Sequence, residues 1–169
     1  QGAGGQAGMY GAAHAEEAAL AKQEAARALA LVPSRPLNER LNVTSEGTLL
    51  TKFNLRDGKA SLRWVRLSVG ENRLFWGDAK TRECKSNVAL SGATALLHGA
   101  KGSAFYKMRQ KKMLQQQWCF SLVFKERTLD FAADDPGTLL DWYLALAEFV
   151  PQSTEPLLDE QALRRAMLA

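Results

Sequence analysis

From residue 47 onward the hydrophobic pattern of this chain changes from a period of two residues to a period of 3.6, and this order limits the folds that it can form. Residues 47–133 alternate apolar and polar side chains in short runs, as antiparallel strands do. Residues 135–150 instead repeat leucine and aromatic residues at helical spacing. A single amphipathic helix that follows several strands must bury its apolar face against their sheet. We therefore predict a small barrel capped by a helix.

Turn residues divide the alternating part into short strands. Asp57-Gly58 suits a tight hairpin between the first two runs. The pattern predicts six or seven antiparallel strands, at 47–54, 60–69, 73–78 and about 93–99, with two more inside 117–133. Residues 79–92 show a looser pattern, and 100–117 are predicted to form a long basic loop with room for a helical turn.

The helical part begins and ends at clear signals. Asp135 is a good N-cap, Pro136 fits the first helical position, and Pro151 ends the helix. The leucine and aromatic residues between them lie on one apolar face, which is predicted to cover an open end of the sheet. The predicted structural core includes Trp142, Phe120, Leu122 and Phe131.

The N-terminal part has a different composition. Residues 1–8 are glycine-rich and are predicted to be flexible. Alanine dominates 9–32, which predicts a helix with only a thin apolar stripe. If this helix is ordered, we expect contacts to another chain or to the outside of the barrel from Leu20, Leu29 and Leu31. Two prolines follow, and 33–46 are predicted to be a linker.

These patterns divide the chain into three parts. They are a flexible segment, helix and linker at 1–46, a barrel domain at 47–150, and a linker with a short helix at 151–169. Because the strands and the capping helix close on themselves, we expect 47–150 to fold without either tail. The chain begins with Gln1 rather than Met, so we expect it to be a piece of a longer protein.

Charge is distributed unevenly along the sequence. Residues 52–82 contain eight bases and three acids, and 101–112 contain five bases and no acid. Residues 126–160 contain nine acids and one base, Arg127. We therefore expect an electrical dipole, with a basic end that attracts anions and an acidic end that does not.

The residues argue against an enzyme, a metal site and a membrane span. Cys84 and Cys119 are too few for a disulfide framework or a zinc site, and they favour a reducing, cytoplasmic compartment. Neither His14 nor His98 stands at a catalytic spacing from a nucleophile or an acid. No phosphate-binding glycine motif, secretory leader or apolar run of about 18 residues is present. We expect no cofactor, and nucleic acid is not indicated because no recognition motif accompanies the charge.

Three segments carry features of a known family. RWVRL lies in the second predicted strand, LFW lies in the third, and WCFSLVFKERTLDFAADDPGTLLDWYLALAEF runs into the last helix. Over about 47–150 the chain resembles a pleckstrin homology (PH) domain, with Trp142 at the place of the family's helix tryptophan, and it is closest to the phospholipase C type. The resemblance implies a seven-stranded antiparallel barrel, mainly β with α, that is closed at one end by a C-terminal helix. Loops after strands 1, 3 and 6 then ring the open end.

In family members that bind phosphoinositides, this rim carries the bases that meet phosphate. The resemblance implies a head-group site made of Lys52, Arg63, Lys80, Arg82 and Lys59. Lys52 and Arg63 match phosphate-binding positions of the phospholipase C type. The alternation agrees for Arg63, which shares a strand face with Val65 and Leu67 and is therefore predicted to point inward.

The basic loop is a second candidate contact surface. It interleaves bases with aromatic and flexible apolar residues, as a surface that meets a membrane or an acidic partner does. The predicted contact residues are Lys101, Phe105, Tyr106, Lys107, Lys111 and Lys112.

Two departures from the family pattern leave two functions open. Leu50 stands where inositol-phosphate binders carry a second lysine, and Val65 breaks the usual spacing of bases after Arg63. One function is a non-catalytic module that binds phosphoinositide or an anionic membrane surface and targets a larger protein, cytoplasmic or peripheral to the membrane. The alternative is a protein-interaction or scaffolding module in a cytoskeletal or ciliary assembly, with partners on the N-terminal helix.

Overall fold

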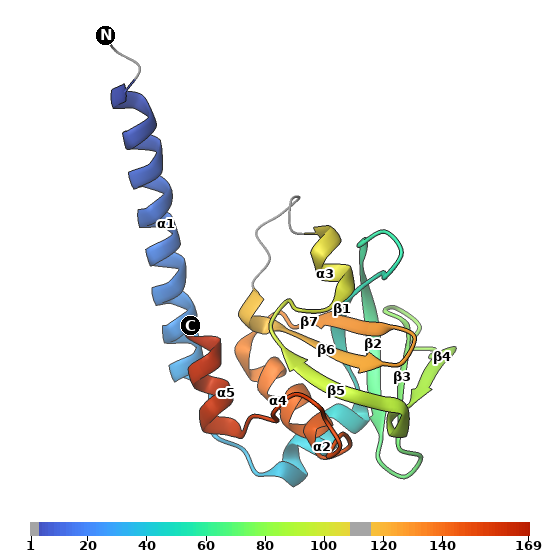
Figure 1. The fold of residues 1–169 in the computed structure, drawn as a ribbon. Helices are drawn as coiled ribbons and strands as arrows, with labels where there is room; N and C mark the ends of the chain where they lie inside the picture. Colours follow the sequence, from blue (N-terminus) through green and yellow to red (C-terminus); the bar gives the residue numbers. More distant parts are fainter. Residues whose placement is uncertain (1–3, 109–115) are drawn as a thin grey trace.

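Seven strands form one antiparallel sheet that bends around the core (Figure 1). The computed structural model describes residues 4–108 and 116–169, with side chains at 10–105 and 116–169. The strand order across the sheet is β4-β3-β2-β1-β7-β6-β5. The strands are β1 (Thr48–Phe53), β2 (Ala60–Ser68), β3 (Arg73–Asp78), β4 (Ser86–Ala89), β5 (Ala93–His98), β6 (Cys119–Phe124) and β7 (Thr128–Ala132). The helices are α1 (Gly4–Ala30), α2 (Leu37–Glu46), α3 (Ser103–Met108), α4 (Pro136–Ala147) and α5 (Glu160–Met167), with short 3-10 turns at Leu90–Gly92 and Gln116–Trp118.

Helix α4 occupies the centre of the core. Asp135 caps it, because its Oδ1 accepts a hydrogen bond from the Thr138 backbone N–H at 2.8 Å. The Trp142 side chain is buried and its Nε1 donates to Thr48 Oγ1 at 2.6 Å, which ties the helix to β1. Phe120, Leu122 and Phe131 are also fully buried. The predicted fold class, a seven-stranded antiparallel barrel with a C-terminal capping helix, is therefore confirmed.

Two elements lie where the pattern is weakest. Strand β4 has four residues and falls inside 79–92, where the sequence shows no clear alternation. It lies at an edge of the sheet, so only one of its two sides pairs with another strand. Its side chains do not alternate between buried and exposed, so the sequence shows no strand pattern there. Helix α3 begins inside the predicted loop 100–117 and is longer than a single turn.

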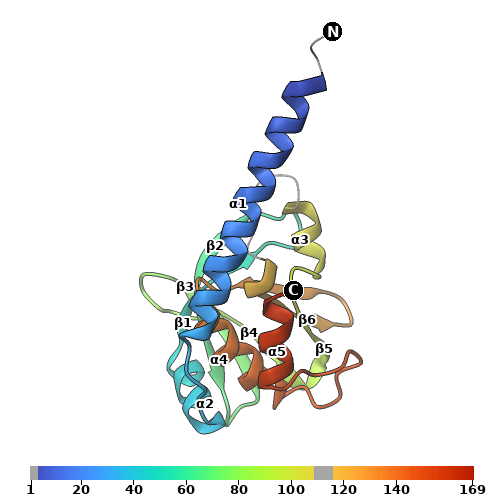
Figure 2. The ribbon, with the colours of Figure 1, turned by 90° about the vertical axis from the view of Figure 1, so that its left-hand side faces the viewer.

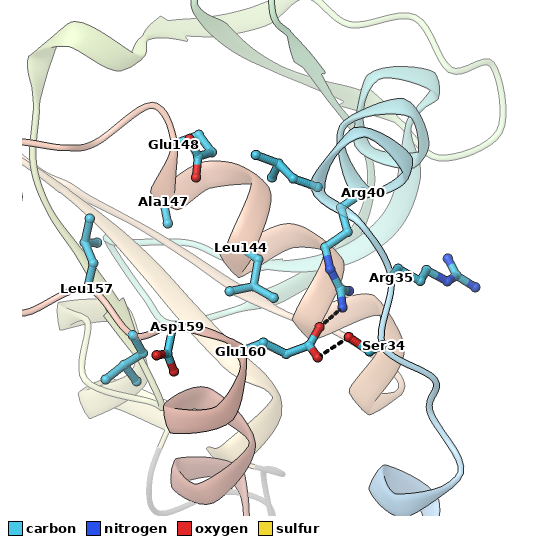
Figure 3. A pocket seen from close by; sticks show the side chains of 11 residues that line it. Ser34, Arg35, Arg40, Leu144, Ala147, Glu148, Leu157, Asp159 and Glu160 are labelled. Carbon is cyan, nitrogen blue, oxygen red and sulfur yellow. Dashed lines mark hydrogen bonds and ion pairs between the residues drawn. The ribbon is translucent and has the colours of Figure 1, made fainter.

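The predicted linker 33–46 is wrong for all but its first four residues, because Leu37–Glu46 form α2. Pro36 precedes this helix, a place that proline tolerates because the first helical N–H groups need no partner within the helix. The helix packs against α4 and β2, and it buries Arg40 and Thr44. The Arg40 guanidinium donates to Asp141 Oδ1 of α4 at 2.7 Å and also pairs with Glu160 of α5 (Figure 3).

The last turn of α1 and the C-terminal helix α5 both contribute side chains to the core. Leu29 of α1, with Leu163 and Met167 of α5, belongs to the same buried cluster as Trp142. Arg164 of α5 donates hydrogen bonds to the carbonyl oxygens of Leu29 and Val32, at 3.2 and 2.9 Å, where α1 ends. The hydrophobic core therefore crosses both predicted boundaries, 47 and 150.

The rest of α1 projects away from the barrel (Figure 2). Every side chain from Tyr10 to Glu24 is exposed. Of the three leucines expected to make contacts, Leu29 is buried against this chain, whereas Leu20 of α1 and Leu31, just after α1, are exposed. In the described part of the chain, no helix is both long enough and apolar enough to span a bilayer.

Candidate anion-binding site

Bases gather around one partly buried tryptophan, Trp76 of β3. Trp76 follows the buried Leu74 by two residues on the inner face of β3. The Lys52 Nζ lies 5.7 Å from the centroid of the Trp76 ring, and the Arg127 Cζ lies 5.8 Å from it. These distances suit cation–π contacts. Two strands and the turn between β6 and β7 thus bring two cations to one ring.

Arg63 stands on the same inner face of the sheet. It is partly buried, and Val65 and Leu67 on its strand face are fully buried, as the alternation predicts. The β2–β3 register pairs Arg63 with Asp78 and Val65 with Trp76. Arg63 and Trp76 also line a pocket of about 400 Å³, whose charged lining residues besides Arg63 are Asp78, Glu83 and Lys85.

The electrostatics of this site favour an anion. Burial lowers the pKa of Lys52, and the neighbouring charges of Arg127 and Arg63 lower it further, whereas the charge of Asp130 acts in the opposite direction. Among the described residues, no carboxylate lies within ion-pair distance of any of these three bases. A bound anion would offset both the burial of Lys52 and the mutual repulsion of the bases. We name Lys52, Arg63, Trp76 and Arg127 the Trp76 site.

The other predicted head-group residues lie elsewhere. Lys59 and Lys80 are exposed, and their backbone N–H groups donate to the side chains of Asp57 and Asp78 in turns. The Arg82 Cζ stacks 4.1 Å from the ring centroid of Trp64.

The stacking on Trp64 places Arg82 on the outer face of the sheet. Trp64 adjoins Arg63 in β2, and successive side chains of a strand point to opposite faces. In this structure Arg82 therefore does not lie beside Arg63, and its part in head-group binding stays a prediction. Arg82 also has a positive φ of 60°, which turns the chain back at this point.

The predicted contact loop is only partly available to a membrane or a partner. Phe105 of α3 is buried, with its ring centroid 4.7 Å from that of Phe53 in β1. The prediction that Phe105 contacts a membrane or partner is wrong, because α3 packs this side chain against the outside of β1. Lys101 is exposed. The side chains of Tyr106 and Lys107, and all of Lys111 and Lys112, lie outside the described residues.

A buried carboxylate fixes the start of α3. Asp130 in β7 accepts hydrogen bonds from Ser121 Oγ at 2.6 Å and Thr128 Oγ1 at 2.9 Å, and from the Ala104 backbone N–H at 3.4 Å. Gly102 passes so close that a Cβ there would lie 1.5 Å from Asp130 Oδ1. The chain entering α3 is therefore held against β7.

Sequence reasoning missed Arg127. It is the single base in an otherwise acidic stretch, so a count of charge by segment places it at the acidic end of the dipole. Its position in the turn after β6 is the signal that identifies it, because that turn was expected at the open rim. In the described residues, no group of three or more potential metal ligands occurs.

No protein-family model matches the chain, and no curated protein matches its sequence. Solved structures do match its shape. Inner Membrane Complex Sub-compartment Protein 3 (ISP3) from Toxoplasma gondii matches with a TM-score of 0.51 and 14% identity, over 70% of this chain and 86% of ISP3. ISP1 from the same organism matches with a TM-score of 0.50 and 12% identity, over 70% of this chain and 96% of ISP1.

PLC21 from S. officinalis matches with a TM-score of 0.51 and 11% identity. The match covers 70% of this chain but only 16% of PLC21. Identities this low show a shared fold, and they do not distinguish the phospholipase C type from other types. Together with the seven-stranded antiparallel sheet and the helix that carries Trp142, they establish that this chain has a pleckstrin homology-like fold.

Proposed function

We propose that this chain is a non-catalytic PH-like module that binds the phosphorylated head group of a phosphoinositide at the Trp76 site and so targets a larger protein to an anionic membrane surface. The observation that carries this proposal is the convergence of Lys52, Arg63 and Arg127, with no carboxylate of the described residues within ion-pair distance of any of them. No cofactor or metal enters the proposal.

The three bases differ in what they offer a phosphate. Lys52 is partly buried and brings a compact charge. Arg63, also partly buried, and Arg127, exposed in its turn, bring planar forks that meet phosphate oxygens with two parallel hydrogen bonds. A phosphomonoester carries nearly two negative charges, so it is attracted to these bases more strongly than a lipid head group that carries one.

The distribution of charge over the rest of the module also favours binding to an anionic membrane. Lys59, Lys80 and Lys101 are exposed bases outside the Trp76 site, and the segments 52–82 and 101–112 have a surplus of bases. Each base near an anionic surface adds about 1 kcal/mol of nonspecific attraction. An approaching membrane would therefore be met by the basic side of the module.

Vesicle co-sedimentation tests this proposal. Vesicles with phosphoinositide are compared with phosphatidylserine vesicles of matched charge, for the wild type and for Lys52→Ala with Arg63→Ala. The wild type is expected to prefer phosphoinositide, and the double variant is expected to lose that preference. Lys22→Ala with Arg165→Ala removes two exposed bases far from the site and is the matched control. A wild type without preference means that the specific site does not exist.

One observation favours a second function, a protein-interaction or scaffolding module in a cytoskeletal or ciliary assembly. Helix α1 has 27 residues, yet only its last turns pack on the barrel (Figure 2). A helix of this composition gains little stability alone in water, so a partner that covers it would explain its length. ISP1 and ISP3 are named for an inner membrane complex, which is compatible with a peripheral assembly. Deletion of 1–24 that abolishes partner capture but leaves vesicle binding intact would support this function.

A further inference from the structure

A second pocket lies between the start of α2 and helices α4 and α5, away from the Trp76 site (Figure 3). Its volume is about 560 Å³, which is within the usual range of binding pockets. Leu144 and Ala147 of α4 form an apolar wall. Leu37 and Leu157 stand at its edges and are 39% and 36% exposed. Large apolar side chains thus face solvent around a concave surface, which is typical of a docking site. We name it the α4–α5 pocket.

The charge around this pocket is negative. Three acids line it, Glu148, Asp159 and Glu160. Two bases line it as well, but Arg35 pairs with Asp141 of α4, and Arg40 pairs with both Asp141 and Glu160. The Glu148 side chain is exposed and makes no ion pair with any residue that the structure describes. The pocket therefore combines apolar walls with two carboxylates, Glu148 and Asp159, that make no ion pair with any residue that the structure describes.

The walls are held in place before any partner arrives. Arg40 bridges α2 to both α4 and α5, and Ser34 Oγ donates to Glu160 Oε2 at 2.6 Å (Figure 3). Asp159 caps α5 through the Ala162 backbone N–H at 2.8 Å. Because these contacts already fix the three elements, binding loses little conformational entropy.

We propose that the α4–α5 pocket docks an amphipathic helical segment of a partner protein, with leucine-like side chains against Leu144 and Leu157 and with lysine or arginine side chains beside Glu148. Charge complementarity selects this occupant: a basic segment is attracted here and repelled by the basic Trp76 site. Helices that dock in this way present anchors at positions i, i+3 or i+4, and i+7. This proposal goes beyond head-group binding, since it gives the module a second, simultaneous partner.

The test uses the full chain and a fluorescently labelled helical peptide of leucine and lysine, about 14 residues long. Fluorescence anisotropy measures its affinity at low and high salt. Leu37→Ser with Leu157→Ser is expected to weaken binding about tenfold at both salt concentrations, because apolar contacts are not screened. Glu148→Lys is expected to weaken binding severalfold at low salt and little at high salt.

Matched controls separate docking from general attraction to an acidic surface. Glu155→Lys changes an exposed acid outside the pocket, and Leu20→Ser changes an exposed leucine of α1; both are expected to leave the affinity within about twofold of the wild type. Lys52→Ala with Arg63→Ala is also expected to leave it unchanged, so failure here and failure of head-group binding are distinguishable. Circular dichroism melts confirm that each variant is folded.

Three results would overturn the proposal. The wild type binds the leucine–lysine peptide no better than a matched leucine–glutamate peptide, or the paired serine variant binds it as the wild type does. The third is that Glu155→Lys weakens binding as much as Glu148→Lys. If the paired serine variant does not fold, Glu148→Lys against Glu155→Lys decides the question alone, because both are surface changes.

Discussion

Replacing Arg40 by methionine tests whether the segment before the barrel belongs to the core. The Arg40 side chain is 2% exposed, and it pairs with Asp141 and Glu160. Methionine keeps much of its length but removes its charge, so Asp141 stays buried with only Arg35 nearby, at 3.4 Å. Removing one partner of a buried ion pair costs about 3–5 kcal/mol. Glu160 is more exposed and can be hydrated, so its share is about 1 kcal/mol or less.

Urea unfolding of the full chain, followed by circular dichroism, measures this loss. Each kcal/mol lowers the melting temperature by about 2–4 °C in a chain of this size. Arg35→Met is the matched control, because Arg35 pairs with the same carboxylate but its side chain is 43% exposed; a cost below about 1 kcal/mol is expected. Arg40→Met combined with Asp141→Leu should recover most of the loss, since no buried charge is left alone.

The same variant has a predicted pH dependence. Burial raises the pKa of Asp141 above its usual value, although Arg40 and Arg35 act in the opposite direction. A carboxyl group whose pKa is higher in the folded than in the unfolded state costs stability when ionised, and that stability returns as the pH falls through the folded pKa. Without Arg40 the pKa rises further. The difference in unfolding free energy between wild type and Arg40→Met should therefore be largest near neutral pH and shrink towards about pH 4, the unfolded value.

Two results would refute this reasoning. One is a cost for Arg40→Met no larger than that for Arg35→Met. The other is a difference from the wild type that grows as the pH falls, because protonation of Asp141 removes the uncompensated charge. Either result would mean that α2 only rests on the surface of the barrel.

Three other perturbations test the packing of the barrel. Trp142→Ala should cost about 3–5 kcal/mol in urea unfolding, and a loss below about 1 kcal/mol would contradict its burial. Gly102→Ala would set a Cβ 1.5 Å from Asp130 Oδ1 and should cost about 2 kcal/mol or more, whereas Gly11→Ala, with nothing within 4 Å, should leave the melting temperature unchanged or higher. Burial raises the pKa of the Cys119 thiol to about 12, so alkylation near neutral pH should label the partly exposed Cys84 first; equal labelling by mass spectrometry would contradict this.

Local patterns predicted the parts of the fold that depend on neighbours in the sequence. Asp135 and Pro136 mark the start of α4 because capping involves residues within one turn. Alternation likewise locates β2 and places Arg63 on the inner face. The helix α2 escaped prediction because its contacts are with elements distant in sequence, α4 and β2, and its Arg40 donates to Asp141, 101 residues away. A lone arginine after two prolines carries no local sign of such a partner.

In the candidate site too, local patterns predicted some features, whereas others depend on contacts between residues distant in sequence. The inner placement of Arg63 follows from strand period, but the outer placement of Arg82 depends on its stacking against Trp64, 18 residues earlier in a different element. Phe105 was misplaced because a basic, aromatic loop has the same composition whether its aromatic side chain meets a membrane or packs on a sheet. Only the contact with Phe53 distinguishes the two.

Helix α4 connects the surfaces described above. Its Trp142 reaches into the barrel and donates to Thr48, in the strand that also carries Lys52 of the Trp76 site. Leu144, two residues further along α4, lies in the wall of the α4–α5 pocket instead. A cut at 47 would remove Arg40 but leave Asp141 buried in the same helix. Because one helix closes the barrel and supports the pocket, the segments that pair with it hold both surfaces in a single folding unit.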